Sequence, residues 1–208
     1  MTRTIPLLAQ LALLLPALAL GQEAAPKLEE DPRAAKFKDV ERGFFIGFEA
    51  GYMGLLKTPT ANPEKFPLAG SGGGRAGGML VGAVVGVDLG RFLSVAAYVQ
   101  DGNARASPDY GAFSVYAAGL DVKLALFGRK DVNDWERFYF YLHGRGGYAK
   151  TSPEGLFGTK ENILAGGLGV EYYTRLRHFS IALGADALYA TKAKASGYAV
   201  YPTVRYTF

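Results

Sequence analysis

Two histidines and one glycine-rich run are the features of this sequence that first suggest chemistry. His178 and Ser180 have the spacing of a His-x-Ser pair, in which a histidine can activate a serine hydroxyl if both side chains share a face. His143 has no second histidine at metal-ligand spacing, and the chain has no cysteine. The run Gly72–Gly78 lacks the Gly-Lys-Ser/Thr ending of a phosphate-binding loop. We therefore expect no metal or cofactor site.

A second group of chemically capable residues is charged and lies at alternate positions within otherwise apolar segments. Opposite charges that face a confined interior should pair, because an unpaired buried charge costs several kcal/mol. The pairing predicts a plug of ion pairs; the alternative interpretation is a gate or a proton path. Tyr141 and Tyr201 are expected beside the charged set, whose members are Glu49, Asp121, Lys123, His143, Arg145, Glu171, Asp186 and Arg205.

The segments that carry these residues alternate with period two. In the first, Phe44, Ile46 and Phe48 lie on one face, and Gly47 and Glu49 lie on the other, which is the pattern of a strand with one apolar and one polar or small face. About ten residues is the length that a tilted transmembrane strand needs. Eight such segments are expected, at residues 44–55, 77–89, 92–100, 114–126, 138–145, 164–172, 179–189 and 198–208.

The connections between these segments alternate in length. Those at 56–75, 101–112, 151–162 and 191–197 are long and polar, those at 88–91 and 175–178 are tight, and 128–136 is intermediate. This layout predicts an all-β fold, an eight-stranded antiparallel up-and-down transmembrane β-barrel over residues 43–208, with both termini on the short-turn, periplasmic side. A water-soluble barrel would turn its apolar face inward. The smallest residues lie on the charged face instead, where a narrow lumen needs them.

The first 42 residues read as targeting and linker sequence. Arg3 precedes an apolar stretch that ends in small residues, which predicts a cleaved signal peptide at 1–21. An uncleaved anchor would need a longer uninterrupted apolar run than Pro6 and Pro16 allow. Residues 22–42 are charged and contain two prolines, and we expect a flexible periplasmic leader. With 23 basic and 19 acidic residues, the chain does not have the composition of a nucleic-acid-binding protein.

The last strand resembles the C-terminal signature of bacterial outer-membrane barrels. Val204, Tyr206 and Phe208 match its alternating apolar positions and terminal aromatic residue, whereas Pro202 departs from it and indicates a bulge or weak pairing. The resemblance is to the small eight-stranded class, of the OmpA transmembrane-domain and OmpX types. It implies an integral outer-membrane protein whose C-terminal residues are read by the barrel-assembly machinery. The glycine-rich barrel also resembles outer-membrane proteins of myxobacterial adventurous gliding motility, the CglE type, although no motif carries that likeness.

These observations favour a non-enzymatic barrel that serves as a structural or docking component of an envelope or gliding-motility complex. Its partners would be outer-membrane lipid and lipopolysaccharide, the assembly machinery, and envelope proteins that meet four extracellular loops or the leader. A narrow gated channel is the alternative. A more distant alternative is an outer-membrane lipid A deacylase, because His178 and Ser180 resemble the catalytic pair of that family. The expected topology places this pair beside a periplasmic turn and facing the lumen, so we interpret it as coincidental.

Overall fold

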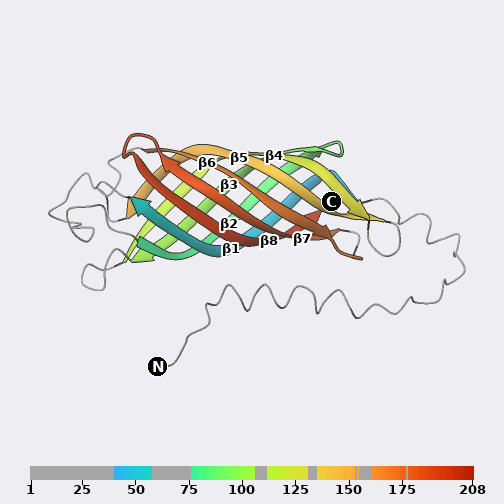
Figure 1. The fold of residues 1–208 in the computed structure, drawn as a ribbon, viewed down its shortest axis with the longest axis horizontal. Helices are drawn as coiled ribbons and strands as arrows, with labels where there is room; N and C mark the ends of the chain where they lie inside the picture. Colours follow the sequence, from blue (N-terminus) through green and yellow to red (C-terminus); the bar gives the residue numbers. More distant parts are fainter. Residues whose placement is uncertain are drawn as a thin grey trace, which may run out of the picture. The chain divides into compact units, whose positions relative to one another are not determined.

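The structure, a computed structural model, describes residues 40–57, 76–105, 112–130, 135–152, 154, 161–176 and 178–208. The expected signal peptide and residues 22–39 of the leader lie outside the described residues. Eight strands form one closed antiparallel barrel in which each strand pairs with its neighbours in sequence and β8 pairs with β1 (Figure 1). The predicted fold is confirmed. The strands are β1 (Phe44–Lys57), β2 (Ala76–Leu89), β3 (Leu93–Arg105), β4 (Ala112–Lys130), β5 (Glu136–Ser152), β6 (Glu161–Tyr173), β7 (Phe179–Ala190) and β8 (Ala195–Thr207).

The seam between β1 and β8 closes the barrel. Its ladder runs from Phe45 opposite Thr207 to Lys57 opposite Ser196, and the amide of Phe208 donates to the carbonyl of Phe44 at 2.8 Å. The ladder is interrupted for two residue pairs beside Pro202 and resumes in the same register. Pro202 therefore marks weak pairing rather than a bulge, because proline has no N–H to donate to the ladder.

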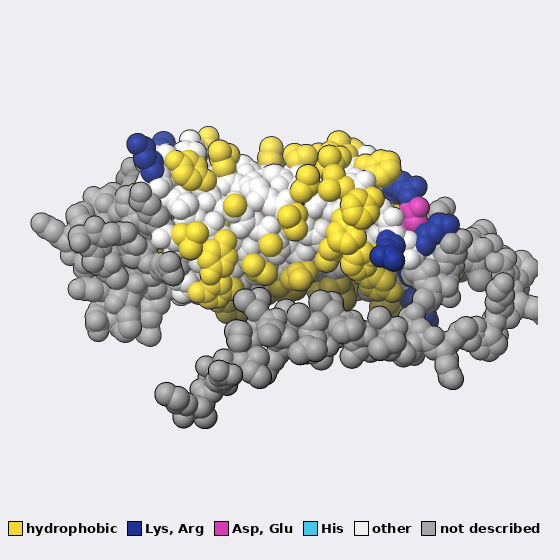
Figure 2. All heavy atoms as spheres, in the orientation of Figure 1, with side chains coloured by type: hydrophobic (Ala, Val, Ile, Leu, Met, Phe, Trp, Pro, Cys, Tyr) yellow, Lys and Arg dark blue, Asp and Glu magenta, His cyan; other side chains and the backbone are white. Residues whose placement is uncertain are grey.

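The outer wall is apolar between two bands of aromatic residues. One band, at the end that carries the C-terminus, includes Phe44, Phe92, Phe127, Phe179 and Phe208, and the other includes Tyr52, Tyr116, Tyr148, Tyr189 and Tyr198. Asp101 lies on this wall opposite Tyr116 of the second band, and Figure 2 shows Lys and Arg only near the two ends of the face in view. Such a surface suits lipid, with the aromatic bands at the two interfaces. No described residue lies in a helix long and apolar enough to cross a membrane.

The connections correct one part of the sequence-based expectation. We call the end with the β2–β3, β4–β5 and β6–β7 connections the turn end, and the opposite end the loop end. The connection between β7 and β8, expected as a long loop over 191–197, is a four-residue turn over 191–194. The buried carboxylate of Glu161 holds this turn by accepting hydrogen bonds from the amides of Lys192, at 2.7 Å, and Ala193, at 2.9 Å. The barrel thus has three longer connections at the loop end instead of four.

Candidate functional site: the filled lumen

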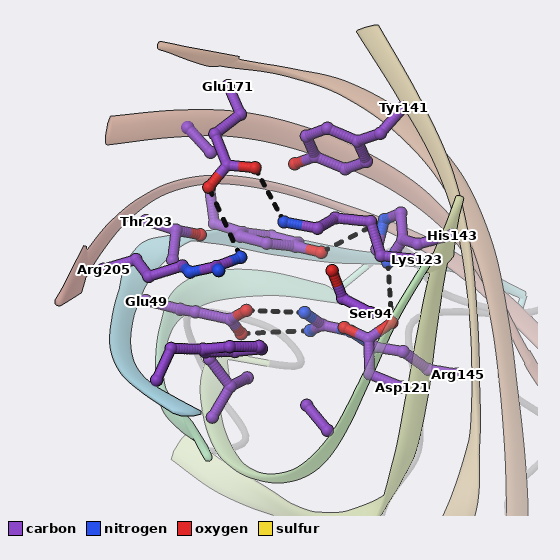
Figure 3. A pocket seen from close by; sticks show the side chains of 15 residues that line it. Glu49, Ser94, Asp121, Lys123, Tyr141, His143, Arg145, Glu171, Thr203 and Arg205 are labelled. Atoms are coloured by element: carbon purple, nitrogen blue, oxygen red, sulfur yellow. Dashed lines mark hydrogen bonds and ion pairs between the residues drawn. The ribbon is translucent and has the colours of Figure 1, made fainter. Parts of the chain in front are cut away.

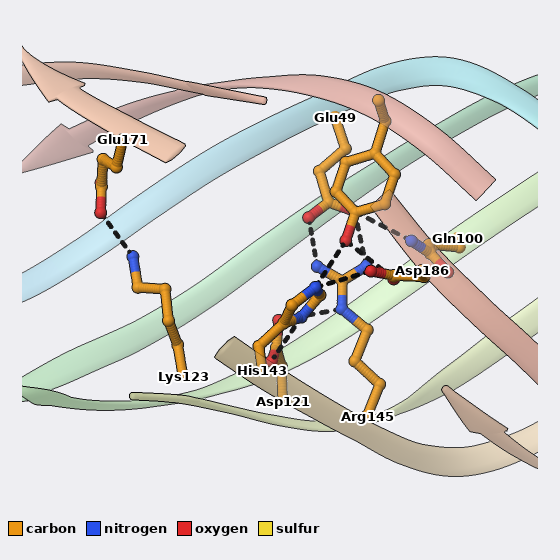
Figure 4. A network of polar contacts seen from close by, with 9 residues as sticks. Glu49, Gln100, Asp121, Lys123, His143, Arg145, Glu171 and Asp186 are labelled. Carbon is orange, nitrogen blue, oxygen red and sulfur yellow. Dashed lines mark hydrogen bonds and ion pairs between the residues drawn. The ribbon is translucent and has the colours of Figure 1, made fainter. Parts of the chain in front are cut away.

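Arg145 is the centre of a buried ion-pair cluster midway along the lumen. It extends inward from β5, and its two terminal nitrogens donate to the two carboxylate oxygens of Glu49 on β1 at 3.0 and 2.5 Å. Its Nε donates to Asp121 on β4 at 2.9 Å, and Gln100 donates to Glu49 at 2.9 Å (Figure 4). The guanidinium also lies 5.0 Å from the centre of the Tyr201 ring. One arginine therefore ties β5 to β1 and β4 across the barrel.

His143 extends this cluster toward β7. Its Nε2 lies 2.6 Å from the Asp186 carboxylate, and its Nδ1 lies 3.4 Å from the carboxylate of Asp121. A carboxylate therefore lies within ion-pair distance of each ring nitrogen. Tyr201 donates its hydroxyl to the other oxygen of Asp186 at 2.9 Å. The histidine is thus held by partners on two strands.

A second ion-pair cluster lies between Arg145 and the turn end. Lys123 contacts Glu171 at 2.7 Å, and Ser180 donates to the other oxygen of Glu171 at 2.7 Å. Arg205 pairs with Asp88 and stacks over the ring of Phe45. The two clusters line a cavity of about 50 Å³, which has room for only a few water molecules (Figure 3).

The loop-side half of the lumen is filled by apolar side chains. Met53, Leu55, Leu80, Phe113 and Val115 point inward from three strands, and each is at most 6% exposed. They belong to one buried hydrophobic cluster, which Ala104, Ala149 and Ala195 extend. We call this cluster the apolar plug. An eight-stranded barrel is just wide enough for side chains to fill. Here the apolar plug occupies the loop-side half of the lumen, and the ion-pair clusters lie on its turn side.

The structure places all eight charged or histidine residues expected in the lumen on the inner face and joins them into these two clusters. Sequence reasoning missed three further buried charged residues, Asp88, Arg137 and Glu161, and the apolar plug. Asp88 and Leu80 lie on the same face as Gly82 in the period-two pattern, so strict alternation would have found them. Glu161 was assigned to a loop and had no such signal.

The His-x-Ser pair does not form a catalytic contact. Ser180 is buried in the lumen and donates to Glu171, whereas His178 lies at the turn-end rim, stacks on the ring of Tyr206 and contacts Glu41 at 2.6 Å. The expectation that both side chains face the lumen is wrong for His178, because it precedes β7 and lies outside the strand alternation. No group of three or more His, Asp or Glu side chains in the described part of the chain is arranged to hold a metal ion.

The junction between leader and barrel crosses the turn-end mouth. Arg42 donates to the carbonyl of Arg91, in the β2–β3 turn, at 2.7 Å. Its guanidinium also lies over the rings of Tyr139 on β5 and Tyr173 on β6, at 5.1 and 5.8 Å from their centres. Arg42 therefore holds this junction at the mouth through contacts with the β2–β3 turn, β5 and β6.

The C-terminal residues expected to act as an assembly signal lie on the outer wall at the turn end. Val204 and Phe208 are exposed, and Tyr206 packs against Phe179 and Phe208 with ring centres 5.0 Å apart in each case. Phe208 also contacts the ring of Phe44 on β1 at 5.6 Å. These aromatic rings hold the two sides of the closing seam together at its end.

Comparison with known proteins gives a structural likeness. Neisserial surface protein A, NspA, superposes with a TM-score of 0.61 at 16% sequence identity, over 80% of this chain and 97% of that one. The chain has the fold of a small outer-membrane β-barrel. OprG of Pseudomonas aeruginosa superposes with a TM-score of 0.46 at 13% sequence identity, over 82% of this chain and 99% of that one. Ail, the attachment invasion locus protein of Yersinia pestis, superposes with a TM-score of 0.39 at 16% sequence identity, over 79% of this chain and 99% of that one. No protein-family model matches the sequence, and no curated protein matches it.

Proposed function

We propose that this protein is an integral outer-membrane barrel that serves as a structural or docking component of an envelope complex, without enzymatic activity. The observation that carries the proposal is the filled lumen, in which an apolar plug lies in series with two ion-pair clusters. Because lipid would cover the apolar wall, the polar surface available to other molecules lies at the two ends of the barrel. The expected signal peptide and the C-terminal aromatic residues support the outer membrane as its location, with both termini in the periplasm.

The two ends would meet different partners. At the loop end, the exposed side chains of Lys150, Lys192 and Lys194 suit the phosphates of lipopolysaccharide. At the turn end, the leader and the rim would bind a periplasmic or membrane-associated envelope protein, and Val204, Tyr206 and Phe208 would be read by the barrel-assembly machinery. A gliding-motility complex is the finer form of this proposal, and its support is the resemblance to the CglE type.

A narrow gated channel is the second candidate. The polar, turn-side half of the lumen with its cavity of about 50 Å³ favours it. Conduction would require Leu80, Phe113 and their apolar neighbours to leave the loop-side half, at the cost of exposing a packed hydrophobic cluster to water. The separate partners of His178 and Ser180 give no support to a deacylase.

Site-specific photo-crosslinking in native envelopes tests the docking proposal. A photoreactive amino acid replaces Arg175 at the turn end, Lys192 at the loop end, or Leu168 on the lipid-facing wall as the matched control. We expect discrete protein adducts from at least one end and none from Leu168. A well-folded barrel that gives no protein adduct from either end would contradict the proposal.

A further inference from the structure

One patch of the outer wall carries charge at the level of the loop-end aromatic band. The ladders place Asp101 of β3 opposite Tyr116 of β4, and Tyr116 opposite Lys150 of β5, so the three residues form one row across adjacent strands. Asp101 and Lys150 point outward, because their chain neighbours Gly102 and Ala149 face the lumen. We call Asp101, Tyr116 and Lys150 the charged row.

Neither charge of this row has an ion-pair partner within the described part of the chain. The Oδ1 atom of Asp101 is buried and accepts no hydrogen bond. Lys150 is exposed, and it lies two strands away from Asp101 with Tyr116 on the strand between them. A charge on a wall that faces lipid is unfavourable, and so is a buried oxygen without a donor. The row therefore calls for a partner that offers Asp101 a cation and Lys150 an anion.

The order of the charges makes the row complementary to itself. Asp101 and Lys150 lie on opposite sides of Tyr116, each one strand away. A two-fold axis beside Tyr116 and normal to the membrane brings Asp101 of one molecule to Lys150 of a second copy, and the reverse, while both copies keep the same orientation in the membrane. A second copy thus supplies both missing partners at once.

The distances suit this arrangement. Strands of an eight-stranded barrel tilt by about 35–45° and lie about 4.8 Å apart, so Asp101 and Lys150 differ in height by roughly 6 Å. The flexible four-carbon stem of lysine spans such an offset.

The wall beside the row also permits close approach. Gly144 and Gly146 face outward on β5, and a Cβ added at either would meet no atom closer than 3.6 Å. Ala118 is the next outward residue after Tyr116 on β4, and it is exposed. Small residues let backbones approach each other at interfaces within membranes, where packing rather than the hydrophobic effect drives association.

We propose that two copies of this chain associate side by side in the membrane through the wall around Tyr116, with Asp101 of each copy paired with Lys150 of the other. This goes beyond the docking function proposed above and does not depend on it. At this contact Lys150 meets a carboxylate rather than a lipopolysaccharide phosphate. The pairs form at the edge of the lipid, where the low dielectric strengthens them relative to a fully hydrated surface.

Cysteine trapping tests the position of the axis, because the native sequence has no cysteine. Tyr116→Cys should form a disulfide with its own copy under mild oxidation in dilute phosphatidylcholine vesicles that contain no lipopolysaccharide. Tyr189→Cys, in the same aromatic band but on β7, is the matched control and should give only the background of random collisions. Equal cross-linking of the two variants, or none from Tyr116→Cys, overturns the proposal.

Charge reversal tests the pairing without cysteines, with energy transfer between separately labelled barrels as the measure of association. Asp101→Lys and Lys150→Asp should each weaken self-association at least about tenfold, because each brings like charges together. A mixture of the two single variants should form mixed dimers, and the double variant should associate like the wild type. Lys194→Asp, in the β7–β8 turn, is the control and should change nothing.

The heat-modifiable band on unboiled gels confirms that each variant is folded. Single reversals that leave association unchanged, or a double variant that does not recover it, contradict the pairing. If the barrels stay monomeric and the reversals instead alter the binding of purified lipopolysaccharide, the charged row belongs to a lipid headgroup and the dimer is refuted.

Discussion

Replacing Arg145 by methionine should destabilise the barrel severely, although methionine fills a similar space. The substitution removes three charge-assisted hydrogen bonds, two to Glu49 and one to Asp121. Glu49 would keep only its bond from Gln100, and Asp121 its contact with His143. Breaking a buried pair by removing one partner typically costs about 3–5 kcal/mol, because the remaining charge is left uncompensated. The equilibrium constant for unfolding should therefore rise by about two to four powers of ten.

The same reasoning predicts a rescue. Adding Glu49→Gln and Asp121→Asn to Arg145→Met removes the uncompensated charges, and replacing a whole buried ion cluster by neutral groups is often close to neutral. The triple variant should recover most of the lost stability. Lys150→Met, at an exposed position at the loop end, is the matched control, and its effect should stay within about 0.5 kcal/mol.

Reversible urea unfolding in phospholipid vesicles measures these effects, with the heat-modifiable band on unboiled gels as an independent count of folded protein. The triple variant keeps the test informative if Arg145→Met does not fold at all. The reasoning is refuted if Arg145→Met is as stable as Lys150→Met, or if the triple variant is less stable than the single one.

Three further predictions concern closure, packing and orientation. Deleting Phe208, or changing Tyr206 and Phe208 to serine, should deplete the folded band from the outer membrane, because their rings join the ends of the closing seam; wild-type amounts would show that they are ordinary wall residues. Gly51→Ala should lower the free energy of unfolding by about 1–3 kcal/mol, because its Cβ would collide with the carbonyl of Val200 and lie 2.6 Å from the Cα of Tyr201. The Cβ of Gly166→Ala meets nothing within 4 Å, so this variant should be as stable as the wild type in the same urea assay. Lys192→Cys should react with an impermeant maleimide on intact cells and Arg175→Cys only after the outer membrane is opened. Equal labelling of the two positions on intact cells would contradict the assigned orientation.

The barrel and most of its interior follow from one property of the sequence. A strand has a side-chain period of two, so assigning Phe48 to the lipid face assigns Glu49 to the lumen without further information. The same rule assigns Asp121, Arg145 and Asp186, which lie in three other segments, to the inner face. Their meeting in space followed from the small width of an eight-stranded barrel. The rule was applied incompletely to β2, where Leu80 and Asp88 share the inner face.

What sequence reasoning missed depends on contacts between distant segments. The β7–β8 turn is short because the Glu161 carboxylate, about thirty residues earlier in the chain, accepts from its backbone amides. The bulge at Leu126 moves Phe127 to the outer face, and no local signal in the sequence marks it. His178 lies outside β7, where alternation no longer governs the direction of its side chain.

Planar-bilayer recording from the purified barrel tests the filled lumen most directly. With the apolar plug in series with the Arg145 and Arg205 clusters, the account predicts no steady conductance at neutral pH above that of protein-free bilayers, in an apparatus that registers a porin as positive control. Long-lived openings of uniform size, abolished by a bulky substitution at the lumen-facing Gly169 and unaffected by one at the outward Gly166, would show that the lumen conducts and would contradict the account.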